Sequence, residues 1–424
     1  MTIPQIISFA IAFFAIILSL SKKNDPFSPA KSFLIVWGIA IGLAEFKFSG
    51  YQHQWSLYSW FVLLLGLLSF LLGIYIVYVL NLQKPTKALR EIRSTLKNNI
   101  RNYKFYNLYL SIIILFSLYA VAFVSEALIE GYIPLFSSNV AMARVEYGVF
   151  GIHLIVNLQV VIMFLCIEYI VLATGYNKEK FVAWAVFFVT MLSFFLLLQR
   201  FNYFIWAIMS FTFVYYSSEI INFRKIVVIG VIFFAFLWII QSIRLSQYVQ
   251  GFIYVTSKMK YSSKYQAFTE PYMYITMNLE NMARGVDLMQ KHSFGLLTGD
   301  WIIALAGIKK WALNYFNINP RPFLVSGYNT FPFLWEYFYD FGIVGVFIFP
   351  LLSGFFIAKI YYLMRSDIKV KWIVYYSQCM AIILLSFFTN PLTMLNFIFS
   401  IFVLWIIHRF LFVEDDKLSI SSIL

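Results

Sequence analysis

Charged residues and cysteines are both scarce in this chain of 424 residues. Asp, Glu, Lys and Arg make up only 12% of it, whereas hydrophobic residues make up 62%. This composition excludes an ordinary soluble domain. The two cysteines, Cys166 and Cys379, fall within apolar runs, so we interpret them as small core residues and expect no disulfide framework.

Two kinds of chemical motif are also missing. The chain has no phosphate-cradling GxxxxGK sequence, and its His, Cys, Asp and Glu residues show no spacing typical of metal ligands. We therefore expect neither a cofactor nor a metal ion. No internal repeat of fixed period stands out, which disfavours a transporter built from inverted repeats.

Long apolar runs are what the chain has instead. They approach the ~20 residues that a helix needs to cross a bilayer, and they are continuous, whereas the strands of a membrane barrel alternate with a period of two. We therefore predict an all-α polytopic membrane protein, a bundle of about eleven transmembrane helices embedded in the lipid bilayer. The predicted spans are 3–20, 33–44, 57–80, 105–124, 152–173, 181–198, 204–221, 226–243, 341–363, 372–388 and 395–412.

Two parts of this count have alternatives: the second span, and the pair that flanks residues 199–202. The second is short enough to be tilted or partly re-entrant, and the pair that flanks residues 199–202 is alternatively one interrupted segment. By linear division the chain then consists of an N-terminal bundle of about eight spans in 1–243, a long extracytoplasmic loop in 244–340, C-terminal spans in 341–412 and a cytoplasmic tail in 413–424.

The distribution of lysine and arginine orients these spans. Most basic residues of the short loops fall on one side of the predicted membrane, and the densest run lies between Lys84 and Lys104. Positive charge in short loops stays in the cytoplasm, so the N-terminus is expected outside and the C-terminus inside. The net charge of +13 follows largely from this topology. We interpret the basic run as a contact with anionic lipids and expect no nucleic-acid partner.

The long loop carries two segments with apolar residues at helical spacing, 270–291 and 299–316. Such segments are typical of helices that lie in the plane of the membrane interface. They either cap a cavity that receives a lipid-linked substrate or simply shield the bundle.

Arginines on the outer side are the first candidates for binding. They are Arg144, Arg200, Arg244, Arg284 and Arg321. A guanidinium group can fork onto two phosphate oxygens and stays charged at any relevant pH, which points to a lipid phosphate or pyrophosphate. The alternative for each of them is that the side chain only reaches towards the lipid headgroups.

Three segments of the chain resemble a known family. The sequence GYIPLFSSNVAMAR occupies 131–144, GYNTFPFLWEYFYDFGIVGVFI occupies 327–348, and LLLQRFNYFIW places an arginine between two consecutive spans. Their order and topology are similar to those of Wzy-type oligosaccharide repeat-unit polymerases. These enzymes more often have a glycine and paired arginines at the third segment, where this chain has Gln199 and Arg200.

The resemblance implies a membrane glycosyltransferase that is similar to the GT-C class in architecture. Such an enzyme joins undecaprenyl-pyrophosphate-linked glycan units of O-antigen or capsule on the periplasmic face of the bacterial cytoplasmic membrane. It passes the growing glycan to the non-reducing sugar of an incoming lipid-linked unit, and a chain-length regulator is an expected partner. Two alternatives remain, an O-antigen ligase and, with less support, a lipid-linked glycan transporter.

Catalytic roles follow from where charge develops in that reaction. The leaving pyrophosphate would be stabilised by Arg200 and Arg244, assisted by the other outer arginines. A base must take the proton of the acceptor hydroxyl, and its candidates are Asp340, Glu336, Glu126 and His292, of which we favour Asp340. The alternative for Asp340 is that it caps the span beginning at 341. Tyr328 and Asn329 either orient a sugar or only form the turn begun by Gly327.

Overall fold

The regular secondary structure of the described part of the chain is helical, apart from isolated bridges. The computed structural model describes residues 2–20, 25–83, 86–99, 103–137, 146–175, 177–219, 247–289 and 291–411, together with the single residues 143, 225, 228 and 231. Among these residues there is no β-strand, and the predicted all-α class is confirmed.

Among the described residues, five helical segments are long and apolar enough to cross a membrane. They are Leu57–Leu80, Phe105–Phe136, Ile152–Leu172, Asn177–Leu197 and Leu334–Ser366. Further apolar helices are shorter: Pro29–Ala44, Val370–Leu385 and Leu395–Phe410 among them. This pattern supports a multi-pass membrane protein. The count of about eleven spans stays a prediction, and the eighth span, 226–243, lies outside the continuously described residues.

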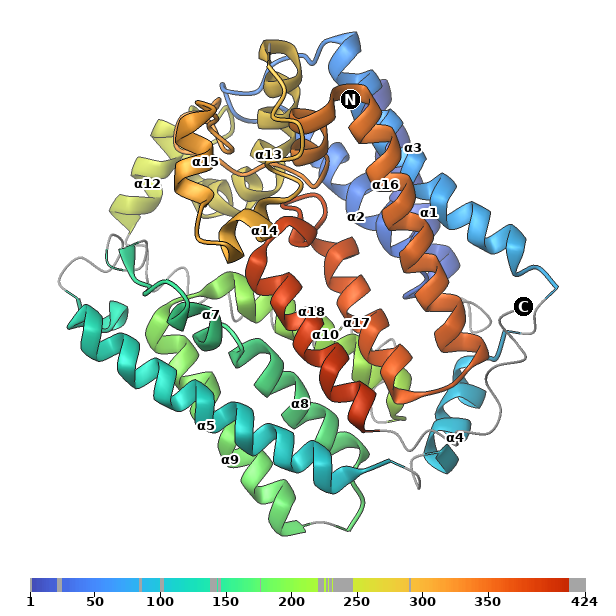
Figure 1. Cartoon of the computed structure of the whole chain (residues 1–424). Helices are drawn as coiled ribbons and strands as arrows, with labels where there is room; N and C mark the ends of the chain where they lie inside the picture. The colour runs from blue at the N-terminus through green and yellow to red at the C-terminus, as the bar shows by residue number, and fades with distance from the viewer. Residues whose placement is uncertain are drawn as a thin grey trace. The chain divides into compact units, whose positions relative to one another are not determined.

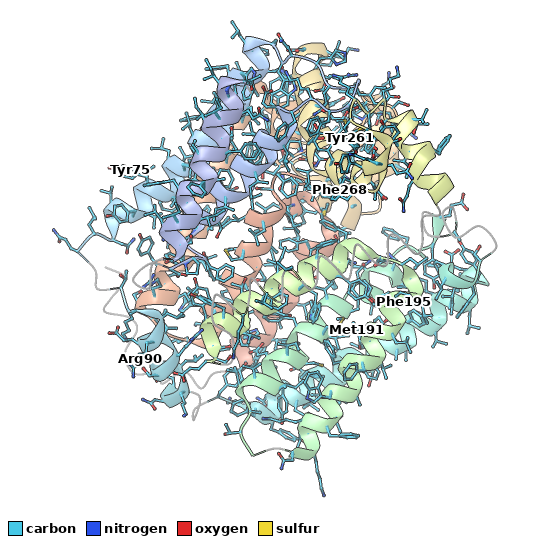
Figure 2. The ribbon with its side chains drawn as sticks, turned by 180° about the vertical axis from the view of Figure 1, so that it is seen from behind. Tyr75, Arg90, Met191, Phe195, Tyr261 and Phe268 are labelled. Carbon is cyan, nitrogen blue, oxygen red and sulfur yellow. The ribbon has the colours of Figure 1, made fainter. Side chains whose placement is uncertain are left out.

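Large apolar side chains cover the outer surfaces of these helices, as expected for helices in lipid. Tyr75 on α3 (Leu57–Leu80) is 59% exposed and Phe195 on α9 (Asn177–Leu197) is 49% exposed (Figure 2). A helix satisfies its own backbone hydrogen bonds, so its side chains determine which environment suits it. The exposed apolar side chains here suit the hydrocarbon of a bilayer.

The chain divides into two compact units that are each discontinuous in sequence. Unit 1 comprises Met1–Thr86, Ile221–Ser366 and Cys379–Leu395, and unit 2 comprises Lys87–Ile220, Asp367–Gln378 and Asn396–Leu424. The predicted N-terminal bundle, 1–243, therefore contributes to both units.

Unit 1 is built around a close pair of helices, α3 and α16 (Leu334–Ser366), beside α1 (Ile3–Leu20) and α2 (Pro29–Ala44) (Figure 1). Glycines allow the backbones of α3 and α16 to touch. A Cβ atom at Gly73 would lie 2.1 Å from the carbonyl oxygen of Leu351, and one at Gly354 would lie 2.1 Å from that of Phe70. Small residues at such crossings are the usual basis of helix packing in membranes.

Aromatic side chains fill the centre of unit 1. Phe33 stacks on Phe70 at 4.1 Å between ring centroids, and Phe333 meets both rings edge-on. The polar edge of the neighbouring Trp37 is satisfied by a hydrogen bond of 2.8 Å from its Nε1 to Ser386 Oγ. Buried tryptophans need such a partner, so this core is both apolar and hydrogen-bonded.

The long loop forms helices within unit 1. They are α12 (Gln247–Thr256), the 3₁₀ helix η3 (Ser263–Phe268), α13 (Thr269–Leu288), α14 (Asp300–Leu305) and α15 (Lys309–Tyr315). Figure 1 shows α13, α14 and α15 gathered near the ends of α2, α3 and α16. The segment predicted as one helix over 299–316 is broken between α14 and α15, where Gly307 has a φ of 73°.

α13 differs from the expected surface helix because most of it is buried against α2 and α3. Its place in the plane of a membrane interface stays a prediction.

Unit 2 consists mainly of α5 (Phe105–Glu130), α8 (Gln159–Leu172), α9 and α10 (Arg200–Ser217), with α18 (Leu395–Phe410) from the end of the chain. α8 packs against α5, α9 and α10. The two spans around 199–202 are separate helices, α9 and α10. The short amphipathic α4 (Leu89–Asn99) lies in the basic run and buries Ile92 and Leu96.

The close contact of α3 with α16 makes a stability prediction. Gly354→Ala places a methyl group against a backbone carbonyl that cannot move alone, and we expect it to cost ~1–3 kcal/mol and to lower the thermal unfolding midpoint of the purified protein. Gly251→Ala on α12 is the matched control, because its Cβ would meet only Gln266 Oε1, at 3.4 Å. Equal midpoints for the two variants would contradict the packing described here.

Candidate functional site

The central element of the candidate site is α13, which carries polar side chains on buried positions. Asn278 and Asn281 are fully buried, and Glu280 is 1% exposed. The helix begins at Thr269 with Pro271 in its first turn, where a missing N–H costs nothing. Apolar residues at helical spacing, such as Met273 and Met277, bury one face. The buried polar residues must therefore find partners in the loops around them.

Glu280 and Arg284 form the main polar contact of α13. Glu280 Oε1 accepts from Arg284 Nε at 3.0 Å and lies 3.1 Å from His53 Nδ1, while Oε2 accepts from Trp55 Nε1 at 2.9 Å. The backbone N–H of His53 also donates to Oε1, at 3.2 Å. A buried carboxylate is tolerated only with such partners, so Glu280 fixes the 53–55 segment on α13.

The side chains of Arg284 and Asn281 hold the segment that precedes α16. Arg284 Nη1 donates to the carbonyl of Leu324 at 2.8 Å, and its Nη2 donates to the carbonyl of Tyr51. Asn281 Nδ2 donates to the carbonyls of Tyr328 and Thr330 at 3.0 and 3.1 Å. Asn281 Oδ1 also accepts from the N–H of Val325, at 3.0 Å. The backbone of this loop is therefore shaped by α13.

Arg284 was predicted to bind pyrophosphate, and that role stays a prediction. In this structure most of its N–H groups already donate to Glu280 and to backbone carbonyls. A guanidinium group has five such donors, so few remain for a ligand.

Arg321 lies within electrostatic range of Glu336, which stands in the first turn of α16. Trp335 Nε1 donates to the carbonyl of Pro320 at 2.9 Å and so fixes the residue before Arg321 on the helix. The Arg321 side chain is exposed, and it acts electrostatically on Glu336, which is 6% exposed. Glu336 Oε2 is buried and has no hydrogen-bond partner among the described residues.

Asp340 is engaged with the loop that precedes α14. Its Oδ1 accepts from Leu297 N at 3.1 Å and from Ser293 Oγ, and its Oδ2 accepts from Thr298 N at 2.6 Å. The residue is fully buried. α16 runs from Leu334 to Ser366 with a kink at Gly342. The carboxylate of Asp340 binds the amides of another segment, so the hydrogen bonds that the structure shows for it are not those of a cap on the span beginning at 341.

A distorted turn in α16 marks where that loop contacts the helix. Gly342 has φ 58° and ψ −141°, a conformation that side chains rarely adopt. His292 lies against it, since a Cβ at Gly342 would be 3.2 Å from His292 Cε1. His292 Nδ1 is 3.2 Å from the carbonyl of Tyr339. The loop 291–299 and α16 are thus locked together around Asp340.

Two further unpaired polar atoms accompany Glu336. Asp300 Oδ1 and Thr298 Oγ1 are buried without a hydrogen-bond partner in the part of the chain that the structure describes. Asp300 acts electrostatically on Glu336, and its other oxygen binds Lys309 Nζ at 2.7 Å. Unpaired acceptors are uncommon in protein interiors, so each of these atoms is a point where a ligand that supplies a hydroxyl donor would gain a hydrogen bond.

The other predicted site residues are placed differently. Tyr328 is half-buried, with a pKa raised by burial, so its phenol stays a neutral hydrogen-bond donor, while Asn329 is exposed. Arg144 and Arg244 lie outside the described residues. Arg200 begins α10 in unit 2, and its side chain is not among those described. Unit 1 therefore brings together Arg321, Glu336 and Asp340 of the predicted set.

The roles of Glu280 and His53 are not evident from the sequence. The spacing of Glu280 and Arg284, four residues apart on one helix, was the available signal for a pair. The hydrogen bonds of Glu280 with residues 53–55 join distant segments, since Trp55 and Glu280 are 225 positions apart in sequence. A single sequence contains no signal for a contact between segments so far apart.

Comparison with protein-family models, curated proteins and solved structures gave no match. The likeness to Wzy-type polymerases therefore stays a resemblance carried by the three segments quoted above.

The environment of Asp340 makes a prediction. In Asp340→Asn the amide that replaces Oδ2 would face the N–H of Thr298, donor against donor, so we expect a loss of ~2 kcal/mol and faster hydrogen exchange at Leu297 and Thr298. Asp287→Asn is the matched control because, among the described residues, the partners of Asp287 are the hydroxyls of Ser56 and Ser59, which can reverse their direction. Unchanged exchange in Asp340→Asn would contradict the role of this carboxylate in holding the loop.

Proposed function

We propose that this protein is a membrane polymerase of undecaprenyl-pyrophosphate-linked oligosaccharide repeat units. The observation that carries the proposal is the buried Glu336 carboxylate, whose Oε2 has no hydrogen-bond partner among the described residues. Glu336 lies within electrostatic range of the exposed Arg321, where the long loop joins the apolar helix Leu334–Ser366. An acid and a cation at such a junction suit a substrate with a lipid anchor and a polar head.

On the donor side, Arg321 meets the pyrophosphate. As the anomeric carbon–oxygen bond breaks, negative charge grows on the leaving phosphate oxygen, and a guanidinium held at that point stabilises it by ~3 kcal/mol. The hydrogen bond from Trp335 to Pro320 keeps the chain next to Arg321 in place before substrate arrives. Arg200, Arg244 and Arg144 remain proposed helpers from the sequence.

On the acceptor side, Glu336 takes the proton. The hydroxyl oxygen of the incoming sugar attacks the anomeric carbon of the growing glycan, the bond from that carbon to pyrophosphate breaks, and the hydroxyl proton passes to Glu336 Oε2. Asp340 was favoured for this role, but its oxygens are occupied by Ser293, Leu297 and Thr298. A base must be free to reach the hydroxyl, so Glu336 fits the role better.

The bond to pyrophosphate supplies the driving force, so no nucleotide takes part in the proposed reaction. The products are a glycan one unit longer on one lipid carrier and a free undecaprenyl pyrophosphate. With the N-terminus outside, the reaction takes place on the periplasmic face of the bacterial inner membrane.

The experiment uses a strain that lacks this gene, complemented with wild type, Glu336→Gln or Arg321→Ala, with surface glycan resolved by gel. We expect wild type to restore a ladder of repeat lengths, and each variant to leave mostly single repeats because the rate of extension falls roughly 100-fold or more. Lys310→Ala, which removes an exposed cation on α15, is the control and should keep the ladder.

Two outcomes would contradict the proposal, provided that each variant is present in the membrane at wild-type level. A normal ladder in both variants would remove the assigned roles. Loss of all anchored glycan in the deletion strain, with lipid-linked polymer accumulating, would identify a ligase instead.

A further inference from the structure

A candidate membrane span in unit 2 is interrupted where a helix would be expected to continue. The apolar segment Ile152–Leu172 consists of two helices, α7 (Ile152–Val156) and α8, separated by Asn157 and Leu158. Asn157 Nδ2 donates back to the carbonyl of His153 at 2.8 Å. Broken helices within spans are tolerated where they are buried in protein or line a polar cavity, and transporters and channels use them for binding sites.

Amide side chains gather at this break. Gln199 Oε1 accepts from Gln159 Nε2 at 3.2 Å and from Asn202 Nδ2 at 2.9 Å. Asn202 Nδ2 also donates to Asn157 Oδ1 at 3.0 Å. Asn396, from the first turn of α18, approaches Asn202 Oδ1 at 3.4 Å. These residues come from the beginnings of α8, α10 and α18, so the cluster lies at one end of the unit 2 helices.

A histidine and a carboxylate complete the amide cluster. Because Gln199 Oε1 already accepts two amide donors, its Nε2 must face His153 Nε2, which lies 3.1 Å away and accepts. His153 Nδ1 then donates to Glu126, at 3.0 Å from Oε1. Glu126 is fully buried and also accepts from Val149 N at 3.0 Å. These contacts thus fix the orientation of each side chain in the hydrogen-bonded series Glu126, His153, Gln199 and Asn202.

Two buried polar atoms at the cluster have no partner among the described residues. They are Oε1 of Gln159, a residue with no exposed surface, and the hydroxyl of Tyr147, whose ring lies edge-on to that of His153. Leaving a buried polar group unpaired costs ~1–3 kcal/mol, a cost that a bound ligand would remove. Asn157, His153 and Gln199 are partly exposed, so a ligand would reach the cluster at these side chains.

We propose that this cluster binds a neutral, hydroxyl-rich ring, that is, a sugar residue. An amide both donates and accepts hydrogen bonds, as a hydroxyl does, and paired amides match neighbouring hydroxyls of one ring. The carboxylate of Glu126 is already bound to His153, so it offers little to a cation. That the sugar belongs to a lipid-linked unit rests on the proposed function. The binding of a sugar rests on residues of unit 2 alone.

The test uses the full-length protein in lipid nanodiscs and saturation-transfer difference NMR. The probes are the methyl glycosides of glucose, galactose, mannose, N-acetylglucosamine and rhamnose. We expect at least one glycoside to bind wild type, and the affinity to fall at least tenfold in Gln159→Met, which keeps the length of the side chain but removes its amide. Asn202→Leu, which removes the central amide, should act in the same way.

Gln378→Leu is the matched control and should keep wild-type binding. Gln378 is a buried glutamine of unit 2 on α17 (Val370–Leu385), and its Nε2 is likewise unpaired among the described residues. Thermal unfolding of each variant shows whether it is folded. If Asn202→Leu is unfolded, Gln159→Met alone tests the role of the cluster in binding.

Absence of binding by all five glycosides, or equal binding by wild type and Gln159→Met, would overturn the proposal and leave the cluster as a contact between helices. Since no lipid-linked donor is present, this result is independent of the polymerase experiment, and each proposal can fail without the other.

Discussion

The candidate site depends on the hydrogen bonds of one buried carboxylate, that of Glu280 on α13. In unit 1 an unpaired charge at this position would be strongly unfavourable, so the chain supplies donors from Arg284, Trp55 and the segment at His53. Arg284, once fixed, binds the carbonyl of Leu324, and this places the loop that carries Arg321. One buried acid thereby organises segments that are distant in sequence.

The same constraint separates structural polar groups from candidate functional ones. Asp340 is buried but satisfied by one hydroxyl and two backbone amides, as a structural carboxylate would be. Glu336 is nearly as buried, yet one of its oxygens has no partner among the described residues. In unit 2 the amides of Gln199 and Asn202 are engaged, whereas Gln159 Oε1 has no partner in the part of the chain that the structure describes. The unsatisfied groups are where a ligand would gain most.

Hydropathy located the helices well because crossing a bilayer imposes a length and an apolar composition on a single segment. Leu57–Leu80 has the predicted bounds, and helices occur at the other predicted spans that the structure describes. The break after Val156 was not foreseen because an Asn between apolar residues barely changes average hydropathy. Periodicity predicts the loop helices. It does not predict the burial of α13, because that burial arises from contacts with segments elsewhere in the chain.

The site was predictable in part. The acids and arginines near the start of α16 stand out as charges beside an apolar run, and in the structure Arg321 lies within electrostatic range of Glu336. The choice between Asp340 and Glu336 could not be made from sequence, because both are acids on one helix and only their hydrogen-bond partners differ. Those partners belong to the 291–299 loop, which has no local pattern that reveals its contact with α16.

Reconstitution of the purified protein into liposomes with an undecaprenyl-pyrophosphate-linked repeat unit tests the central claim most directly. Mass spectrometry would follow the lipid-linked glycans and the free carrier. The proposed reaction predicts glycans that are longer by whole units, with one undecaprenyl pyrophosphate released for each unit joined. Repeat units that remain single, or that cross the bilayer intact without release of the carrier, would contradict it.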